Sequence, residues 1–137
     1  MGQYGRAACI AADLLEGKAE ETPRTAWELA MRRVTTSPSS REKPCPRSTF
    51  LGLCEEGLVR GVRPGSYTSS SDNKSYALRA IRALVDDPTL ASQRGVLWDL
   101  ATGGKLKGRN GQLDVVLALW REGRLNRPVA GLEVGST

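Results

Sequence analysis

Apolar residues recur every three or four positions in six segments of this chain, and proline, glycine or short polar residues bound each segment. This spacing places the apolar side chains on one face of an α-helix, whereas a strand requires strict alternation. Thr22 before Pro23 is typical of a helix start, and Gly57, Gly103 and Gly123 are typical of helix ends. The sequence therefore predicts an all-α fold. The first three expected helices span residues 3–16, 23–34 and 46–56. The fourth begins after an N-cap at Ser71 or Asp72 and extends to Val85, and the fifth is centred on 96–100. The sixth begins after an N-cap at Asn110 and extends to residue 122.

The length of 137 residues predicts one compact helical domain over 1–127, followed by a C-terminal tail at 128–137. Its core must rest on Leu, Ala and Val, because the chain has only one Phe, three Trp and three Tyr. The segment 58–68 has β-branched and aromatic residues around an Arg-Pro-Gly turn, which predicts a short hairpin or an extended loop. No apolar run reaches the roughly 18 residues of a membrane span, so no membrane partner is expected.

The chain has three cysteines, no histidine and a net charge of +5. The lack of histidine excludes Ser-His-Asp and Cys-His nucleophile systems and most zinc sites, and we expect no metal and no cofactor. An odd number of cysteines without a CxxC pair favours a reducing compartment, so we expect a cytoplasmic protein. The net charge permits an anionic partner. The sequence thus favours binding over catalysis and leaves the oligomeric state open.

The two halves of the chain resemble each other in the same order along the sequence. This echo predicts two tandem three-helix units, at 4–61 and 76–127. The alternative is that leucine- and alanine-rich helices with glycine stops resemble one another by chance. The aligned segments are FLGLCEEGLV (50–59) with VLALWREGRL (116–125), WELA (27–30) with WDLA (98–101), and Tyr4 with Tyr76.

Three segments carry a resemblance to a known group of proteins. They are CPRSTFLGLCEEG at 45–57, NKSYA at 73–77 and LDVVLALWREG at 113–123. Together they resemble a family of uncharacterised bacterial proteins of about this length. The resemblance implies a bacterial origin and a compact domain, and it implies no site residue.

The leading functional hypothesis is a binding module for nucleic acid or another anionic partner, such as an acidic protein. One version is a winged helix, with 46–56 as the helix in the major groove and 58–68 as a basic wing. Glu55 and Glu56 on that helix argue against it, because phosphates repel carboxylates. Asn73 and Lys74 open a helix, where free backbone N–H groups favour an anion. The candidate binding residues are Arg47, Arg60, Arg63, Asn73, Lys74, Arg79 and Arg82.

Two alternatives remain open at this point. Cys45 stands at a helix start near Arg41 and Lys43, and both the helix dipole and the cations favour a thiolate, so one alternative is a small enzyme with Cys45 as a reactive thiol. The other is a helical scaffold for protein–protein interaction. Cys54 lies on an apolar face and is expected in the core.

Overall fold

The computed structural model describes residues 2–16, 22–105, 108 and 110–126, and the predicted all-α fold is confirmed. No strand occurs among these residues, and the six longer helices lie where the sequence predicts them. A one-turn helix and a 3-10 turn were not predicted. The elements are α1 (Gln3–Leu15), α2 (Pro23–Val34), α3 (Pro38–Arg41), α4 (Pro44–Glu55), α5 (Ser71–Asp86), η1 (Pro88–Ser92), α6 (Arg94–Thr102) and α7 (Gln112–Arg121).

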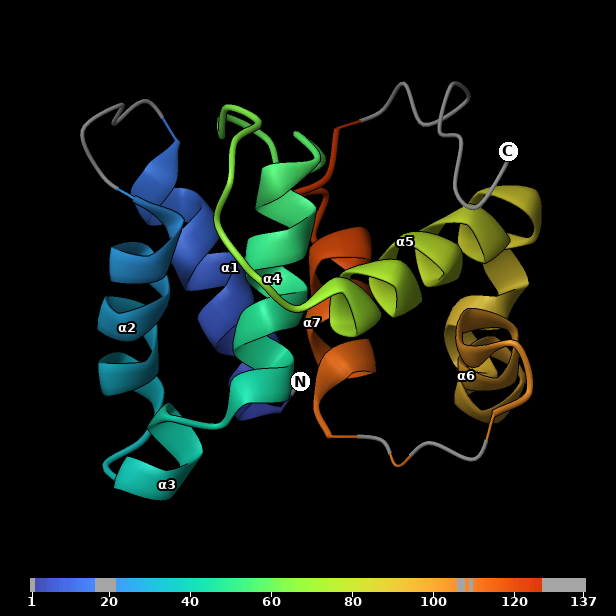
Figure 1. Cartoon of the computed structure of the whole chain (residues 1–137), viewed down its shortest axis with the longest axis horizontal. Coiled ribbons are helices and arrows are strands. Elements are labelled where there is room, and N and C mark those ends of the chain that lie inside the picture. The colour runs from blue at the N-terminus through green and yellow to red at the C-terminus, as the bar shows by residue number, and fades with distance from the viewer. Residues whose placement is uncertain (1, 17–21, 106–107, 109, 127–137) are drawn as a thin grey trace.

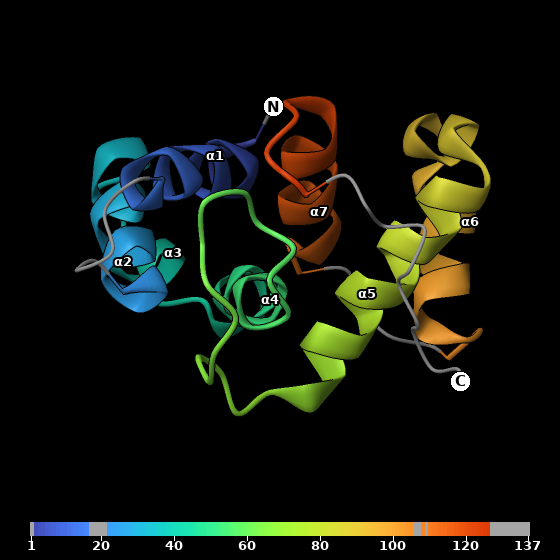
Figure 2. The same cartoon turned by 90° about the horizontal axis from the view of Figure 1, so that it is seen from above.

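Helices α4 and α7 run through the middle of the molecule, with α1 and α2 on one side and α5 and α6 on the other (Figures 1 and 2). Helix α1 packs on α2 and on α7, while α5 packs on α6 and on α4. Each middle helix therefore contacts the long helix of the opposite half of the sequence. Helix α5 crosses α4 and α7 steeply, so that its far end and α6 project to one side (Figure 1).

The two middle helices are buried almost all round. Every residue from 49 to 54 in α4 is buried, and so is every residue from 115 to 119 in α7. A helix that is apolar on all faces belongs inside a fold, whereas a surface helix has one polar face. The winged-helix hypothesis is therefore wrong, because the helix assigned to the DNA groove forms the protein core.

Several helix ends follow the predicted chemistry. The Thr22 side chain accepts a hydrogen bond from Thr25 N at 3.1 Å and caps α2. Gly57, Gly103 and Gly123 all have left-handed backbone conformations at or just after helix ends. After each of these glycines, the following residue donates its N–H to the carbonyl five residues earlier, as in a Schellman motif.

Two predicted N-caps are wrong. Helix α5 is preceded by Ser70, with no side-chain cap, so neither Ser71 nor Asp72 is the N-cap. Helix α7 is preceded by Gly111 in a left-handed conformation, not by Asn110. A Cβ at Gly111 would lie 2.9 Å from Tyr4 Cδ2, so close packing rather than side-chain capping decides the residue there.

The segment 58–68 is an extended loop, and the alternative of a hairpin is wrong. Its one ladder contact is an isolated antiparallel bridge between Val59 and Leu125. Arg60 N donates to Arg124 O at 2.9 Å, and Asn126 N donates to Leu58 O at 2.8 Å. The loop after α4 is thus fastened to the chain after α7, and the ends of the two middle helices are joined.

Within the described ranges, no helix is both long and apolar enough to cross a membrane. The predicted tail at 128–137 lies outside the described residues. The tandem repeat stays a prediction, and the bridge between Val59 and Leu125 joins two residues that the sequence echo aligns.

Candidate functional site

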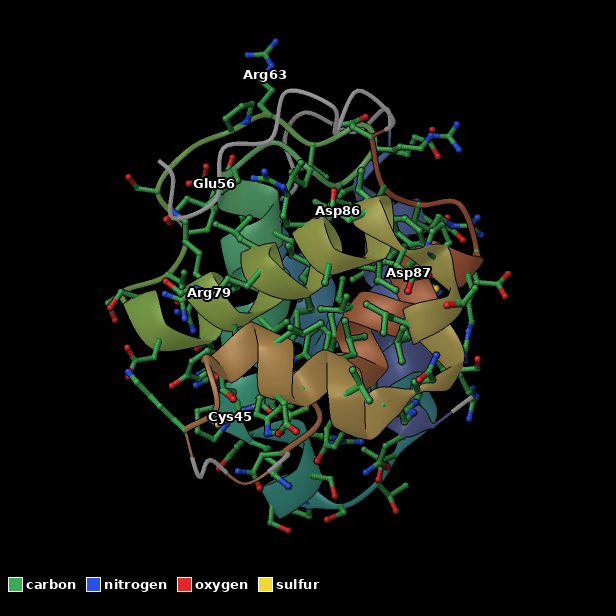
Figure 3. All side chains as sticks on the ribbon, turned by 90° about the vertical axis from the view of Figure 1, so that its right-hand side faces the viewer. Cys45, Glu56, Arg63, Arg79, Asp86 and Asp87 are labelled. Carbon is green, nitrogen blue, oxygen red and sulfur yellow. The ribbon has the colours of Figure 1, made fainter. Side chains whose placement is uncertain are left out.

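The predicted binding residues do not gather on one surface. Figure 3 shows Arg63 at one end of the molecule and Arg79 well away from it on α5; Cys45, the candidate thiol, lies toward the opposite end from Arg63. A surface that tracks the phosphates of nucleic acid needs its cations side by side. The residues therefore have to be considered one neighbourhood at a time.

Lys74 is engaged in a structural ion pair. Its Nζ lies 2.6 Å from Glu55 Oε2 and 2.5 Å from Glu56 Oε2, and its side chain is mostly buried. A Cβ at Gly52 would lie 2.8 Å from Lys74 Cβ, so a glycine on α4 allows the close approach of α5. Two carboxylates neutralise this lysine, and it fastens α5 to the end of α4.

Glu55 also holds the extended loop. Its Oε1 accepts hydrogen bonds from Tyr67 N at 2.7 Å and Thr68 N at 3.1 Å. The hydrogen bond from Lys74, together with these backbone N–H groups, lowers the pKa of Glu55 to about 2. The carboxylate that appeared to disfavour DNA is therefore a clamp between α4, α5 and the loop.

Asn73 connects the starts of α5 and α7. Its Nδ2 donates to Ser70 Oγ at 3.1 Å, and its Oδ1 accepts from Gln112 Nε2 at 3.2 Å. Gln112 is buried, and its Oε1 accepts from Asn110 N at 2.6 Å. These bonds use the polar atoms of the Asn73 side chain within the fold, which gives Asn73 a structural role.

Arg60 is also held within the protein. Its Nη1 donates to Gly123 O at 2.9 Å, and its Nη2 lies 3.7 Å from Glu16 Oε2. Arg63 is exposed, and its carbonyl accepts from Tyr67 Oη at 2.7 Å. In Figure 3 the Arg63 side chain points away from the molecule. One of the two proposed wing arginines is thus paired and the other is isolated.

Arg79 and Arg82 line a groove between α5, η1 and α6. The groove has a volume of about 490 Å³, which lies in the range of small-ligand sites. Arg79 lies toward one end of it, and Asp86 and Asp87 lie toward the other (Figure 3). Three apolar side chains, from Ala83, Leu90 and Leu100, complete the lining.

The Arg79 guanidinium extends toward the carboxyl end of α6. Its Nη1 lies 3.9 Å from where a Cβ at Gly103 would stand, and the negative end of the α6 dipole favours a cation there. Arg79 forms no hydrogen bond or ion pair with the residues that the structure describes. Arg82, in contrast, pairs with Asp86 at 3.9 Å. Arg79 is therefore a positioned guanidinium whose donors are available to a ligand.

An exposed apolar edge borders the same groove. Leu100 is 51% exposed and Val96, one turn earlier on α6, is 47% exposed. Both residues are apolar and lie near the centre of α6, so their exposure is not evident from the sequence. Their helix buries Leu97, Trp98 and Ala101 instead. Leu100 therefore adds exposed apolar surface to a groove that also offers a guanidinium, and Val96 continues this apolar surface along α6.

The cysteines show no catalytic arrangement. Cys45 is partly buried in the first turn of α4, where Pro44 and Pro46 lack the N–H groups that would bind an anion. Burial raises the pKa of the Cys9 thiol to about 11, and burial raises that of Cys54 far above its ordinary value. Among the described residues, no cluster of three or more metal-ligating side chains occurs.

Comparison with known proteins gives a single result. A family model matches residues 1–126, which is nearly the whole chain. No curated protein and no solved structure matches. The expected membership in an uncharacterised family is thereby confirmed, whereas the bacterial origin stays a prediction. The chain belongs to a family of unknown function, DUF6979.

Proposed function

We propose that this protein is a binding module whose groove between α5 and α6 takes a short segment of a partner protein. The segment carries apolar side chains next to an acidic residue. The observation that carries this proposal is the Arg79 guanidinium, which lies in the groove without a partner among the described residues. An unused guanidinium beside apolar surface favours a carboxylate attached to an apolar ligand.

The distribution of charge in the groove supports a peptide over a simple anion. The carboxylates of Asp86 and Asp87 lie at the end of the groove opposite Arg79. The groove therefore complements a bound segment that has an acidic residue at one end and a basic residue at the other. Leu90 and Leu100 supply the apolar contact between these ends. Apolar contact in the centre and charges at the rim are typical of protein interfaces.

Nucleic acid is less favoured as the partner. Lys74, Arg60 and Arg82 are each paired with carboxylates of the chain, and the aspartates in the groove would repel phosphates. The isolated Arg63 and the groove residue Arg79 lie in different regions (Figure 3). A binding surface for duplex DNA would need several adjacent free cations, which Arg60, Arg63, Lys74, Arg79 and Arg82 do not form.

Fluorescence anisotropy with a labelled synthetic peptide tests the proposal. The probe has aspartates at one end, leucines in the middle and lysines at the other end, and a second probe replaces its charged residues by Asn and Gln. We expect saturable binding of the charged probe. Arg79→Gln should weaken it roughly tenfold by removing a charge-assisted hydrogen bond, and Leu100→Ser should weaken it by a similar factor.

Matched controls come from α2. Leu29 is 37% exposed and occupies the position that the echo aligns with Leu100, while Arg24 is an exposed arginine of the same helix. Leu29→Ser and Arg24→Gln should leave binding unchanged, and equal losses in these controls would contradict the proposal. Retention on duplex DNA, with a log-log salt slope that falls by about 2 in Arg60→Ala with Arg63→Ala, would favour nucleic acid instead.

A further inference from the structure

A second pocket lies away from the groove, where α2, α3 and the start of α4 meet. It has a volume of about 280 Å³ and is mostly polar. Three separate helices contribute a guanidinium to it, because Arg32 comes from α2, Arg41 from α3 and Arg47 from α4. The remaining lining residues are Glu28, Pro38 and Glu42.

The three guanidinium groups line one pocket, and none of them forms an ion pair with a described residue. Arg32 and Arg47 form no hydrogen bond or ion pair with other described residues, and neither do the carboxylates of Glu28 and Glu42. The three guanidinium groups of the pocket outnumber its two carboxylates, and an anion bound beside the guanidinium groups would offset their repulsion. Arginine is also the residue best suited to bind phosphate, because its fork of donors matches two phosphate oxygens.

Hydrogen bonds hold the wall formed by α3 in place. Arg41 Nε donates to Thr35 O at 2.9 Å, which leaves the two terminal nitrogens of the guanidinium for other acceptors. Ser37 Oγ accepts from Ser40 N at 3.3 Å, and Tyr4 Oη donates to Ser40 O at 3.4 Å. The connection between α2 and α4 is thus fastened to α1, and Arg41 is positioned before any ligand arrives.

We propose that this pocket binds a small phosphorylated polyol, of the sugar-phosphate class. The guanidinium groups of Arg32, Arg41 and Arg47 hold the phosphate. The carboxylates of Glu28 and Glu42 accept hydrogen bonds from hydroxyl groups of the same molecule. A phosphate alone would face two repelling carboxylates, whereas a ligand with hydroxyl groups uses them. The pocket size suits a small molecule rather than a polymer.

Isothermal titration calorimetry of the full chain tests this proposal with glucose 6-phosphate, inorganic phosphate and glucose as probes. We expect glucose 6-phosphate to bind more tightly than inorganic phosphate, and glucose to give no saturable heat. Arg32→Gln and Arg47→Gln should each weaken glucose 6-phosphate roughly tenfold, since each removes one charge-assisted contact. Glu28→Gln should weaken the binding of glucose 6-phosphate, because it removes an acceptor for a ligand hydroxyl group. The same change should strengthen the binding of inorganic phosphate, because it removes a negative charge that repels the phosphate.

Arg33→Gln is the matched control. Arg33 is an exposed arginine next to Arg32 on α2, and it does not line the pocket. An equal loss of affinity in Arg33→Gln would show general attraction of anions and overturn the proposal. The absence of binding at about 10 mM glucose 6-phosphate would also overturn the proposal. So would a phosphoserine peptide that binds as tightly as glucose 6-phosphate and loses as much affinity in Arg47→Gln. Circular dichroism checks that each variant is folded.

Discussion

The two outer helix pairs, α1 with α2 and α5 with α6, differ at the positions that the sequence echo aligns. Ala7, Ile10, Ala11 and Leu14 of α1 are buried or partly buried apolar residues. Continuing the alignment of Tyr4 with Tyr76 places Arg79, Arg82, Ala83 and Asp86 of α5 at the same positions, and all four line the groove. One helix face can therefore serve as core in one pair and as a charged groove wall in the other.

This difference between the two helix pairs indicates which aligned positions must hold small apolar residues for the helices to pack. The alanines of α1 permit close packing, because a small side chain allows helices to approach. At the corresponding place, α5 has charged side chains, and a short 3-10 turn with the buried Leu90 stands beside them. We infer that the α1–α2 pair mainly provides stability and the α5–α6 pair provides the binding surface.

Exchanging residues at one aligned position should give the largest contrast. Ala7 is completely buried, so Ala7→Arg places a long charged side chain in the core and should cost about 4 kcal/mol or prevent folding. Arg79→Ala removes only an exposed, unpartnered side chain and should change stability by less than about 0.5 kcal/mol. Urea denaturation followed by circular dichroism measures both.

Ala7→Leu keeps this test informative if the arginine variant does not fold. It adds volume without charge and should cost about 2 kcal/mol by overpacking. A neutral Ala7→Leu, or a strongly destabilised Arg79→Ala, would contradict the contrast between the two helix pairs.

The two aligned tryptophans give a second contrast. Trp27 is 1% exposed and stacks on Phe50 with ring centroids 5.4 Å apart, whereas Trp98 is 6% exposed and meets Tyr76 edge-on at 5.6 Å. Trp27→Ala should cost about 4 kcal/mol and Trp98→Ala about 3 kcal/mol, because the site beside the open groove can relax more easily. Equal costs in urea denaturation would mean that the groove does not loosen its side of the core.

Much of the fold follows from local sequence signals. The helical spacing of Leu, Ala and Val predicts the positions of the six long helices. The structure also has the helix start predicted at Thr22 and the helix ends predicted at Gly57 and Gly123. These signals work because each depends on a few neighbouring residues. The N-cap predictions at Asn110 and Ser71 are wrong, since the two helices begin after Gly111 and Ser70. At Gly111 a Cβ would lie 2.9 Å from Tyr4 Cδ2 and 3.2 Å from Pro46 Cβ, and local sequence signals do not show such a tertiary contact.

The candidate site was predicted less well, since charge in a sequence does not reveal pairing. Lys74 and Arg60 have the same formal charge as Arg79, but only the fold brings carboxylates to the first two. Leu100 has the spacing of a core residue, and yet it is 51% exposed among the residues that the structure describes. The alternating roles of Leu97 and Leu100 are decided by tertiary packing, which helical spacing alone does not specify.

The clamp formed by Glu55 gives a prediction about pH. The pKa of Glu55 is lowered from 4.5 to about 2 in the folded protein, so its contribution is complete above about pH 5 and is lost as the pH falls toward about 2. Glu55→Gln should therefore cost about 2 kcal/mol at pH 7, and its stability should fall less steeply between about pH 5 and 2 than that of the parent.

A control for the clamp lies at the matching end of α7. Glu122 is exposed, and the echo aligns it with Glu56 of α4. Glu122→Gln should follow the parent between about pH 5 and 2, since the Glu122 carboxylate forms no ion pair or hydrogen bond with the residues that the structure describes. Thermal melts across this range distinguish the variants, and an unchanged slope in Glu55→Gln would remove the clamp from the account of acid stability.

The smallest effects are expected at the glycines that end the two middle helices. Both Gly57 and Gly123 have left-handed conformations, which an alanine adopts only with strain of about 1 kcal/mol. A Cβ at Gly57 would also lie 2.9 Å from Pro64 Cγ in the extended loop, whereas nothing lies within 4 Å at Gly123. Gly57→Ala should therefore cost about 2 kcal/mol and Gly123→Ala about 1 kcal/mol.

Gly95→Ala in α6 is the control of opposite sign, because its helical backbone and open surroundings should give a gain of about 0.5 kcal/mol. Equal melting of the Gly57 and Gly123 variants would mean that the extended loop yields to the new methyl group, and that the halves differ in the groove rather than at their helix ends.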